Sequence, residues 1–246
     1  MSDLSQRRAL VTGASAGIGE ATARALAAAG ARVTLAARRF ERVQAIAAEL
    51  DGAEALALDV TDSAAVTAAL AGREFDLVVA NAGLARGVEP LQEGDPAEWS
   101  EVIDTNVKGV LNTVRATLQP MLDAGRGDVI LLGSVAGRQV YPGGAVYCAS
   151  KHAVRAIYEG LRQDAGGRGV RFSTVDPGMV KTDFSRVRFR GDEQRAAAVY
   201  DGVDALTPED VAESIVWIAT RPQRVNVGEL VLWASAQSST TKLTRR

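Results

Sequence analysis

Hydrophobic residues gather in short runs that alternate with longer amphipathic stretches. The apolar runs lie at 9–12, 33–37, 55–58, 77–80, 129–132, 170–175 and 230–233, and helical spacing appears at 17–29, 40–50, 62–71, 97–122, 147–165 and 208–220. Strands that are apolar throughout and separated by helices are typical of a parallel sheet covered on both faces. Because crossovers between parallel strands are nearly always right-handed, we predict a doubly wound α/β fold with a seven-stranded parallel sheet.

The same pattern continues through the whole chain without a linker, repeat or low-complexity segment. We therefore predict one domain over residues 1–246. The least regular segment is 178–207, which is rich in glycine and charge, and long connections of this kind are usually functional. We expect it to act as a lid or substrate loop, and the polar tail 234–246 to lie over the surface.

Composition excludes several classes of function. The formal net charge is −2, so electrostatics favours neither nucleic acid nor an anionic membrane as a partner. The chain has one cysteine, Cys148, and one histidine, His152, which leaves no internal disulfide and no multi-His or Cys-rich metal site. The N-terminal residues lack the apolar core of a signal peptide, and no apolar stretch is long enough to span a membrane. We expect a cytoplasmic protein without a metal.

A glycine-rich turn follows the first apolar run, with Gly13, Gly17 and Gly19 leading directly into a helix. Glycine lets the backbone approach a pyrophosphate closely, and the helix N-terminus offers unpaired N–H groups. The spacing is not the generic G-x-G-x-x-G, so a turn without a ligand is the alternative. Asp59-Val60 and Asn81-Ala82-Gly83 follow the third and fourth runs, at the strand ends where ligands of such sheets bind.

The end of the second run indicates which dinucleotide such a turn would hold. An NAD site usually places Asp or Glu there to bind the ribose 2′-hydroxyl, whereas this chain has Ala37 followed by Arg38 and Arg39. Guanidinium groups pair well with a phosphate. We therefore predict NADP(H) rather than NAD(H) as cofactor, the alternative being two solvated charges at the start of a helix.

The segment 147–165 carries the candidate chemistry. Tyr147 and Lys151 have the i, i+4 spacing that places two side chains on one helix face. A nearby ammonium lowers the pKa of a phenol, which would make Tyr147 a usable acid or base. Ser134 ends the fifth run, and Asn106 lies inside the long helical stretch. Taken alone, Tyr147 and Lys151 could be an ordinary surface pair, and Asn106 could be a solvent-facing residue.

Taken together, these residues resemble the short-chain dehydrogenase/reductase family. The resemblance is carried by T-G-x-x-x-G-I-G from Thr12, by Asn81-Ala82-Gly83, and by Asn106, Ser134, Tyr147-x-x-x-Lys151 and Pro177-Gly178 with Thr182, in the family's order and over essentially the whole chain. It implies a Rossmann-fold domain and an enzyme that moves hydride between nicotinamide and an alcohol or ketone. One departure is Ala80, where the family usually has an asparagine.

The resemblance also implies roles. Tyr147 would exchange the proton of the substrate oxygen, Lys151 would lower the pKa of Tyr147 and bind the nicotinamide ribose, and Ser134 would orient the carbonyl. Asn106 would hold a water that connects Lys151 to solvent. The implied cofactor-binding residues are Gly13, Ser15, Gly17, Ile18, Gly19, Arg38, Arg39, Asp59, Val60, Asn81, Ala82, Gly83, Tyr147, Lys151, Pro177, Gly178, Val180 and Thr182. Family members are commonly homotetramers, and we expect one here, with the helices around 97–122 and 147–165 at an interface.

A narrower resemblance concerns the substrate. Residues 182–192, 206–211 and 225–238 are similar to the NADP-dependent 3-hydroxy acid dehydrogenases. Such substrates carry a carboxylate, for which Arg86, Arg186, Arg188 and Arg190 are candidate partners, with Ser134 at the substrate oxygen. The arginines could equally coat a solvated loop or contact another subunit.

Two alternative functions remain at this stage. A ketoreductase for bulkier or acyl-carrier-linked carbonyls would share the same chemistry. A binding protein that senses NADP without catalysis would keep the fold, but it has no need of the set Asn106, Ser134, Tyr147 and Lys151.

Overall fold

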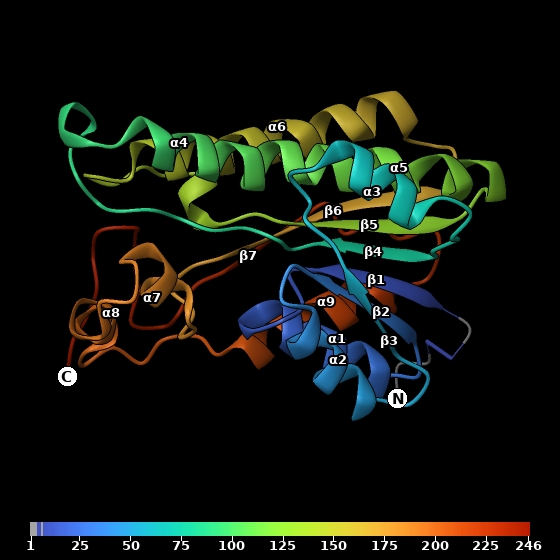
Figure 1. Cartoon of the computed structure of the whole chain (residues 1–246), viewed down its shortest axis with the longest axis horizontal. Helices are drawn as coiled ribbons and strands as arrows, with labels where there is room; N and C mark the ends of the chain where they lie inside the picture. Colours follow the sequence, from blue (N-terminus) through green and yellow to red (C-terminus); the bar gives the residue numbers. More distant parts are fainter. Residues whose placement is uncertain (1–3, 6) are drawn as a thin grey trace.

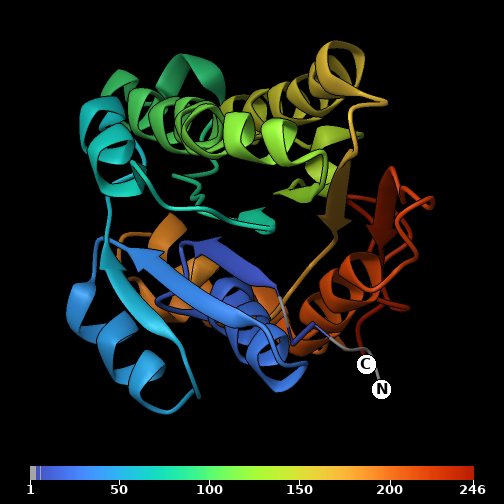
Figure 2. The ribbon, with the colours of Figure 1, turned by 90° about the vertical axis from the view of Figure 1, so that its right-hand side faces the viewer.

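The computed structural model describes residues 4, 5 and 7–246; residues 1–3 and 6, part of the stretch without a signal-peptide pattern, lie outside the described residues. The strands are β1 (Arg8–Thr12), β2 (Arg32–Ala37), β3 (Glu54–Ala57), β4 (Leu77–Ala80), β5 (Gly127–Leu132), β6 (Val170–Pro177) and β7 (Glu229–Leu232). They form one sheet in the order β3-β2-β1-β4-β5-β6-β7, and every adjacent pair is parallel (Figures 1 and 2). The predicted fold class is confirmed.

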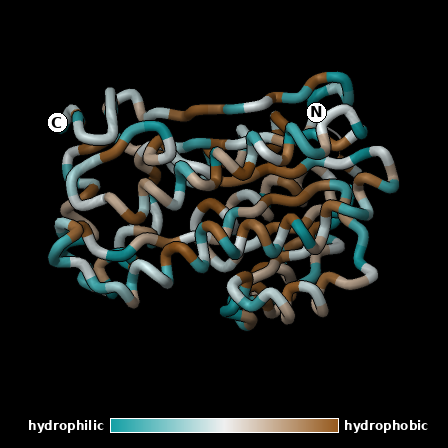
Figure 3. The backbone as a smooth tube through the Cα atoms, turned by 90° about the horizontal axis from the view of Figure 1, so that it is seen from above, coloured by the Kyte–Doolittle hydropathy of each residue, from teal (hydrophilic) through white to brown (hydrophobic). Residues whose placement is uncertain are grey.

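Helices cover both faces of the sheet (Figure 1). One layer contains α1 (Gly17–Ala28), α2 (Phe40–Ala48) and α9 (Pro208–Ala219), and the other contains α3 (Ser63–Leu70), α4 (Pro96–Ile103), α5 (Gly109–Ala124) and α6 (Ala145–Ala165). The central strands are buried on both sides, so each layer packs on its own apolar cluster. Seen from above, apolar segments run through the middle of the molecule, while the helices alternate between apolar and polar residues (Figure 3).

Local signals in the sequence set where several helices begin. The Asp62 carboxylate accepts hydrogen bonds from the N–H groups of Ala64 and Ala65 at the start of α3. At α9, Thr207 and Asp210 form a reciprocal capping box. Such caps satisfy N–H groups that have no partner inside the helix.

The long helix predicted over 97–122 is not one continuous α-helix. A π-helical turn at Asp104–Lys108 joins α4 to α5. Such turns widen the helix by one residue and are frequent at functional sites. Here the turn contains Asn106, which periodicity alone assigned to an ordinary helix interior.

The segment 178–207 is more regular than predicted. It contains α7 (Phe184–Arg188) and α8 (Glu193–Tyr200). These two helices and the C-terminus lie at the same end of the molecule (Figure 1). The polar tail lies against it, since the Arg246 N–H donates to the Gly202 carbonyl over 2.8 Å. Short 3₁₀ turns at Leu91–Glu93 and Val135–Gly137 complete the elements. No helix in the described part of the chain combines the length and apolarity that crossing a bilayer requires.

Candidate active site

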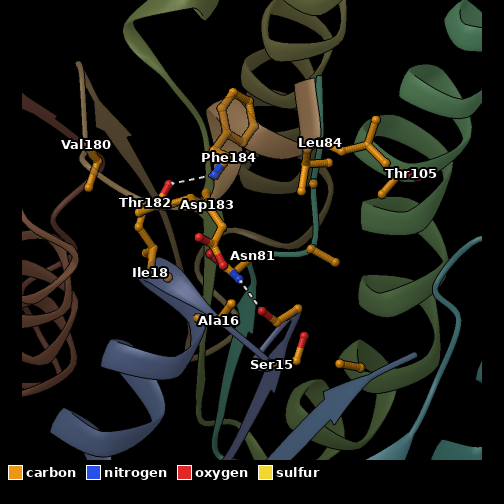
Figure 4. A pocket seen from close by; sticks show the side chains of 18 of the residues that line it. Ser15, Ala16, Ile18, Asn81, Leu84, Thr105, Val180, Thr182, Asp183 and Phe184 are labelled. Atoms are coloured by element: carbon orange, nitrogen blue, oxygen red, sulfur yellow. Dashed lines mark hydrogen bonds between the residues drawn. The ribbon is translucent and has the colours of Figure 1, made fainter. Parts of the chain in front are cut away.

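A pocket of about 450 Å³ opens at the carboxyl ends of the central strands. Its walls bring together most of the predicted residues: Gly13, Ser15, Gly17, Ile18, Gly19, Arg38, Arg39, Val60, Asn81, Ala82, Gly83, Ser134, Tyr147, Lys151, Pro177, Gly178, Val180, Thr182 and Arg186. Figure 4 shows Ser15 and Ala16 of the glycine turn at one end and Phe184 at the other. The order of strands reverses at β1 and β4, which is where ligands of doubly wound sheets bind.

Some predicted residues do not line this pocket, and some residues that line it were not predicted. Asp59, Arg86, Asn106 and Arg188 lie outside its walls. The lining residues that the sequence did not single out include Leu58, Leu84, Thr105, Leu132, Gly133, Asp183, Phe184 and Val187. Most of these are apolar or backbone contacts, whose residue types carry no chemical signal that a motif could detect.

The glycine turn is packed too tightly for side chains. A Cβ atom at Gly19 would lie 2.4 Å from the Gly13 carbonyl oxygen, and Gly13 itself has a φ of +67°. The residue before α1 is Ala16, which provides no side-chain cap. The first N–H groups of α1 therefore face the pocket without a side-chain partner, as a phosphate-binding helix N-terminus requires.

The end of β2 places two guanidinium groups at the pocket wall. Arg39 donates from Nε and Nη2 to the Ser15 hydroxyl, over 3.1 and 2.9 Å, and so joins this strand end to the glycine turn. Burial alone would raise the pKa of Asp59, but hydrogen bonds from Thr61 and the charge of Arg38 lower it overall. Asp59 therefore stays ionised and keeps a negative charge near Arg38, behind the pocket wall.

The loop after β4 approaches the other candidate residues closely. The Asn81 amide donates to the Thr12 carbonyl over 2.8 Å, which ties the loop to β1. A Cβ at Gly83 would lie 3.2 Å from Asn106 Oδ1 and 3.6 Å from Lys151 Nζ. Glycine thus lets this backbone sit directly against the Lys151 ammonium.

Tyr147 lies near the start of α6 and lines the pocket. Its ring packs edge-on against Phe184, with ring centres 5.6 Å apart, and its hydroxyl lies near enough to Ser134 for that side chain to act on the pKa of the phenol. Ser134 accepts the Ala136 N–H over 3.1 Å, which fixes its hydroxyl at the end of β5. Two hydroxyl groups from different elements therefore meet at one point of the wall.

Charges around Tyr147 differ from those expected. Burial raises the pKa of Tyr147 to about 12, and Tyr141 adds to the increase, while the Arg188 guanidinium and the Ser134 hydrogen bond oppose it. The cation that acts on this phenol is thus Arg188, which the sequence did not associate with Tyr147. Lys151 Nζ lies 5.9 Å from the centre of the Tyr147 ring. That Lys151 lowers the pKa of Tyr147 stays a prediction.

Lys151 lines the pocket but is buried, with a relative exposure of 6%. Its ammonium donates to the Leu132 carbonyl over 2.8 Å. Burial lowers the pKa of Lys151 to about 8, and the carboxylate of Asp176 partly opposes this. Asp176 is itself buried and accepts a hydrogen bond from Arg138 Nε over 2.8 Å. A negative charge is thereby held near the buried ammonium.

The buried ammonium has a consequence for stability against pH. The ordinary pKa of lysine is 10.5, so from about pH 8 upwards the unfolded chain binds a proton that the folded chain releases. The cost of burying the charge is complete below pH 8 and declines as the pH rises towards 10.5. We expect the unfolding free energy of the wild type to gain about 1–3 kcal/mol relative to Lys151→Met between about pH 7 and pH 10.

Urea unfolding of both proteins at the two pH values measures this difference. Groups that titrate in the same way in both proteins do not contribute to it. Parallel pH dependence in the two proteins would contradict the assigned burial.

Asn106 is buried, and both the oxygen and the nitrogen of its side-chain amide are hydrogen-bonded. Its Oδ1 accepts the Leu84 N–H over 2.8 Å, and its Nδ2 donates to the Leu84 carbonyl and to the Ser150 hydroxyl over 2.8 and 3.0 Å. The solvent-facing alternative is therefore wrong. Asn106 joins the π-turn to the loop after β4 and to α6, and the water-holding role remains a prediction.

Three of the four arginines proposed for a substrate carboxylate show how their surroundings differ. Arg86 donates from Nε and Nη2 to both carboxylate oxygens of Glu101, over 2.7 and 2.6 Å, and also contacts the Val187 carbonyl. Arg186 is exposed and pairs with Glu193 at 3.5 Å. Arg188 instead donates to the Tyr141 hydroxyl over 2.8 Å, and its guanidinium carbon lies 5.2 Å from the centre of the Tyr147 ring.

Comparison with known proteins identifies the family. The short chain dehydrogenase family matches residues 7–193, which include the glycine turn, Ser134, Tyr147 and Lys151. The chain belongs to the short-chain dehydrogenase family. The resemblance inferred from the sequence motifs is thereby confirmed.

Individual relatives in this family cover nearly the whole chain. The NADP-dependent 3-hydroxy acid dehydrogenase of Escherichia coli strain K12 is 42% identical over 236 residues, which span 93% of this chain and 95% of that protein. Serine 3-dehydrogenase of Rhizobium radiobacter is 40% identical over 235 residues, or 93% of this chain and 94% of the relative. Among solved structures, the closed form of serine dehydrogenase complexed with NADP⁺ superposes with a TM-score of 0.92 at 40% identity, covering 97% of this chain and 99% of that one.

Proposed function

We propose that this short-chain dehydrogenase is an NADP(H)-dependent enzyme that interconverts the hydroxyl of a small 3-hydroxy acid and the corresponding ketone or aldehyde. The observation that carries the proposal is one continuous pocket with phosphate-binding features at one end and the hydroxyls of Tyr147 and Ser134 at the other. In NADP the nicotinamide ring and the adenosine with its 2′-phosphate lie at opposite ends and the pyrophosphate lies between them, which matches this division.

The chain's residues fit the cofactor. The uncapped N-terminus of α1 would hold the pyrophosphate, and Arg38 and Arg39 with Ser15 would hold the 2′-phosphate. A carboxylate at position 37 would repel that phosphate, and the chain has Ala37 there. The 3-hydroxy acid dehydrogenase relatives are themselves named NADP-dependent, which supports the same choice.

When bound, the nicotinamide ring supplies or accepts the hydride. The protein's own contribution is to hold and protonate the substrate oxygen: Ser134 orients it, and the Tyr147 hydroxyl donates the proton when a ketone is reduced. A pKa of about 12 keeps Tyr147 protonated near neutrality, which suits reduction. In oxidation the same oxygen takes the alcohol proton, and the positive charges of Lys151 and Arg188 stabilise the phenolate.

The proposed substrate class rests on the relatives and on the segment 178–207. The relatives are named for 3-hydroxy acids and serine. Thr182, Asp183, Phe184, Arg186 and Val187 line the pocket, so the segment forms part of its wall. We propose that it acts as the substrate loop of the single domain.

The test is turnover of a panel of 3-hydroxy acids, neutral secondary alcohols and bulky keto esters with NADP⁺ or NADPH and with NAD⁺ or NADH. The proposal expects the highest kcat/KM for small 3-hydroxy acids with the phosphorylated cofactor. Preference for bulky uncharged carbonyls would favour the ketoreductase alternative, and cofactor binding without any turnover would favour the sensing protein.

We also propose a cytoplasmic homotetramer, in which α5 and α6 contribute to one interface. The family resemblance supports this, and so does the exposed Leu111 on α5. Light scattering coupled to gel filtration should give about four times the mass of 25.8 kDa, and Leu111→Glu should lower it. A monodisperse monomer at working concentration would contradict the assignment.

A further inference from the structure

We propose that Arg188 is the residue that binds the substrate carboxylate, an inference that rests on the proposed function. Arg188 ends α7 in the segment 178–207; it lies just behind the pocket wall, with its guanidinium against Tyr147 and Phe184, which line the pocket. Four arginines near the pocket were equal candidates from the sequence. Their surroundings in the structure separate them.

Other arginines near the pocket already have carboxylate partners. Arg86 is neutralised by a bidentate pair with Glu101, and Arg190 donates to Glu98 over 2.6 Å. Arg186 pairs with Glu193 and is half exposed to water, so its charge is screened. None of these needs a further anion to balance it.

Arg188 differs because its charge has no counter-ion. Within the described part of the chain, its guanidinium donates one hydrogen bond, to the neutral Tyr141 hydroxyl, and its buried Nε has no hydrogen-bond partner. Aromatic rings surround it, with the centres of Tyr141, Tyr147 and Phe184 at 5.8, 5.2 and 5.3 Å. A cation removed from water normally has an anionic partner, and here no carboxylate of the described chain supplies one.

The backbone on both sides of Arg188 is held in place. The Gly87 N–H donates to the Arg188 carbonyl over 3.1 Å, and Arg86 binds the preceding carbonyl of Val187. Arg86 therefore acts as a positioning residue, which fixes α7 against the loop after β4. The guanidinium of Arg188 is pre-organised, so little conformational entropy is lost when an anion binds.

The position also suits the length of a 3-hydroxy acid. Two carbon–carbon bonds of about 1.5 Å each separate the carboxylate carbon from the carbon that carries the hydroxyl. With that hydroxyl at Tyr147 and Ser134, the carboxylate lies within a few ångströms of the Tyr147 ring, on whose face Arg188 sits. An anchor at this distance discriminates 3-hydroxy acids from neutral alcohols.

The test uses a matched pair of substrates, 3-oxobutanoate and its methyl ester, reduced with NADPH. Reduction is chosen because Tyr147 is then the protonated donor, and removing the Arg188 charge keeps it protonated. The variants are Arg188→Gln and Arg188→Lys, and the control is Arg195→Gln, an exposed arginine on α8 outside the pocket.

We expect Arg188→Gln to lower kcat/KM for the acid about ten- to a hundredfold while the ester changes less than about threefold. Arg188→Lys should be intermediate, because it keeps the charge but loses the planar fork. The control should match the wild type on both substrates. Ester turnover also shows that each variant is folded.

Two results would overturn the proposal that Arg188 binds the carboxylate. In the first, both Arg188 variants lose kcat/KM equally for the acid and the ester; in the second, neither variant loses kcat/KM for either substrate. Either would assign Arg188 to the electrostatics of Tyr147 or to the structure of the loop. Failure of the proposed function is recognised separately, because the wild type itself would then reduce the ester but not the acid.

Discussion

Replacing Tyr147 with phenylalanine should lower kcat at least about a thousandfold and leave NADPH affinity almost unchanged. The substitution removes one hydroxyl from the pocket wall, so the ring still packs against Phe184 while the proton donor is lost. Single-turnover kinetics and fluorescence titration of NADPH measure the two quantities.

Tyr158→Phe is the matched control for this experiment. Tyr158 lies on the same helix, is fully buried, and accepts a hydrogen bond from Arg162 instead of facing the pocket. Its variant should keep wild-type kcat. Near-normal turnover of Tyr147→Phe would show that another group donates the proton.

The second large effect concerns the cofactor. Arg38→Ala should weaken NADPH about ten- to a hundredfold and leave NADH almost untouched, because only the 2′-phosphate contact is lost. Ala37→Asp should reverse the preference, since a carboxylate at the end of β2 repels the phosphate and accepts a hydrogen bond from a 2′-hydroxyl. Comparing kcat/KM for both cofactors in each variant tests both statements.

Arg32→Ala serves as the control, because Arg32 is an exposed arginine at the opposite end of β2. A wild type that prefers NADH, or an Arg38→Ala variant that loses both cofactors equally, would refute the assigned phosphate site.

Much of the fold could be predicted from the sequence because burial leaves a direct trace in residue type. Each of the predicted apolar runs corresponds to a strand. The run at 129–132, for example, corresponds to β5, which begins two residues earlier and covers Gly127–Leu132. Tyr147 and Lys151 could be paired because helical spacing is local. These inferences depend on neighbours within one or two turns of chain.

Features that depend on tertiary contacts left no such trace. Arg188 is near Tyr147 only because α7 packs across the end of the sheet, and no periodicity relates the two residues. Asp176 approaches Lys151 through the pairing of β5 with β6, which a list of apolar runs does not describe. The π-turn was not predicted either, because the apolar spacing within each flanking helix remains that of an α-helix.

That π-turn changes how the outer surface of this helix should be engineered. An extra residue at Asp104–Lys108 rotates everything after it by about 100° relative to an unbroken α-helix. A helical wheel drawn from Pro96 to Ala124 therefore places the residues of α5 on the wrong side. Surface redesign around Leu111 should count positions afresh from Gly109, and deleting one residue from the turn would rotate α4 and α5 relative to one another by about 100°.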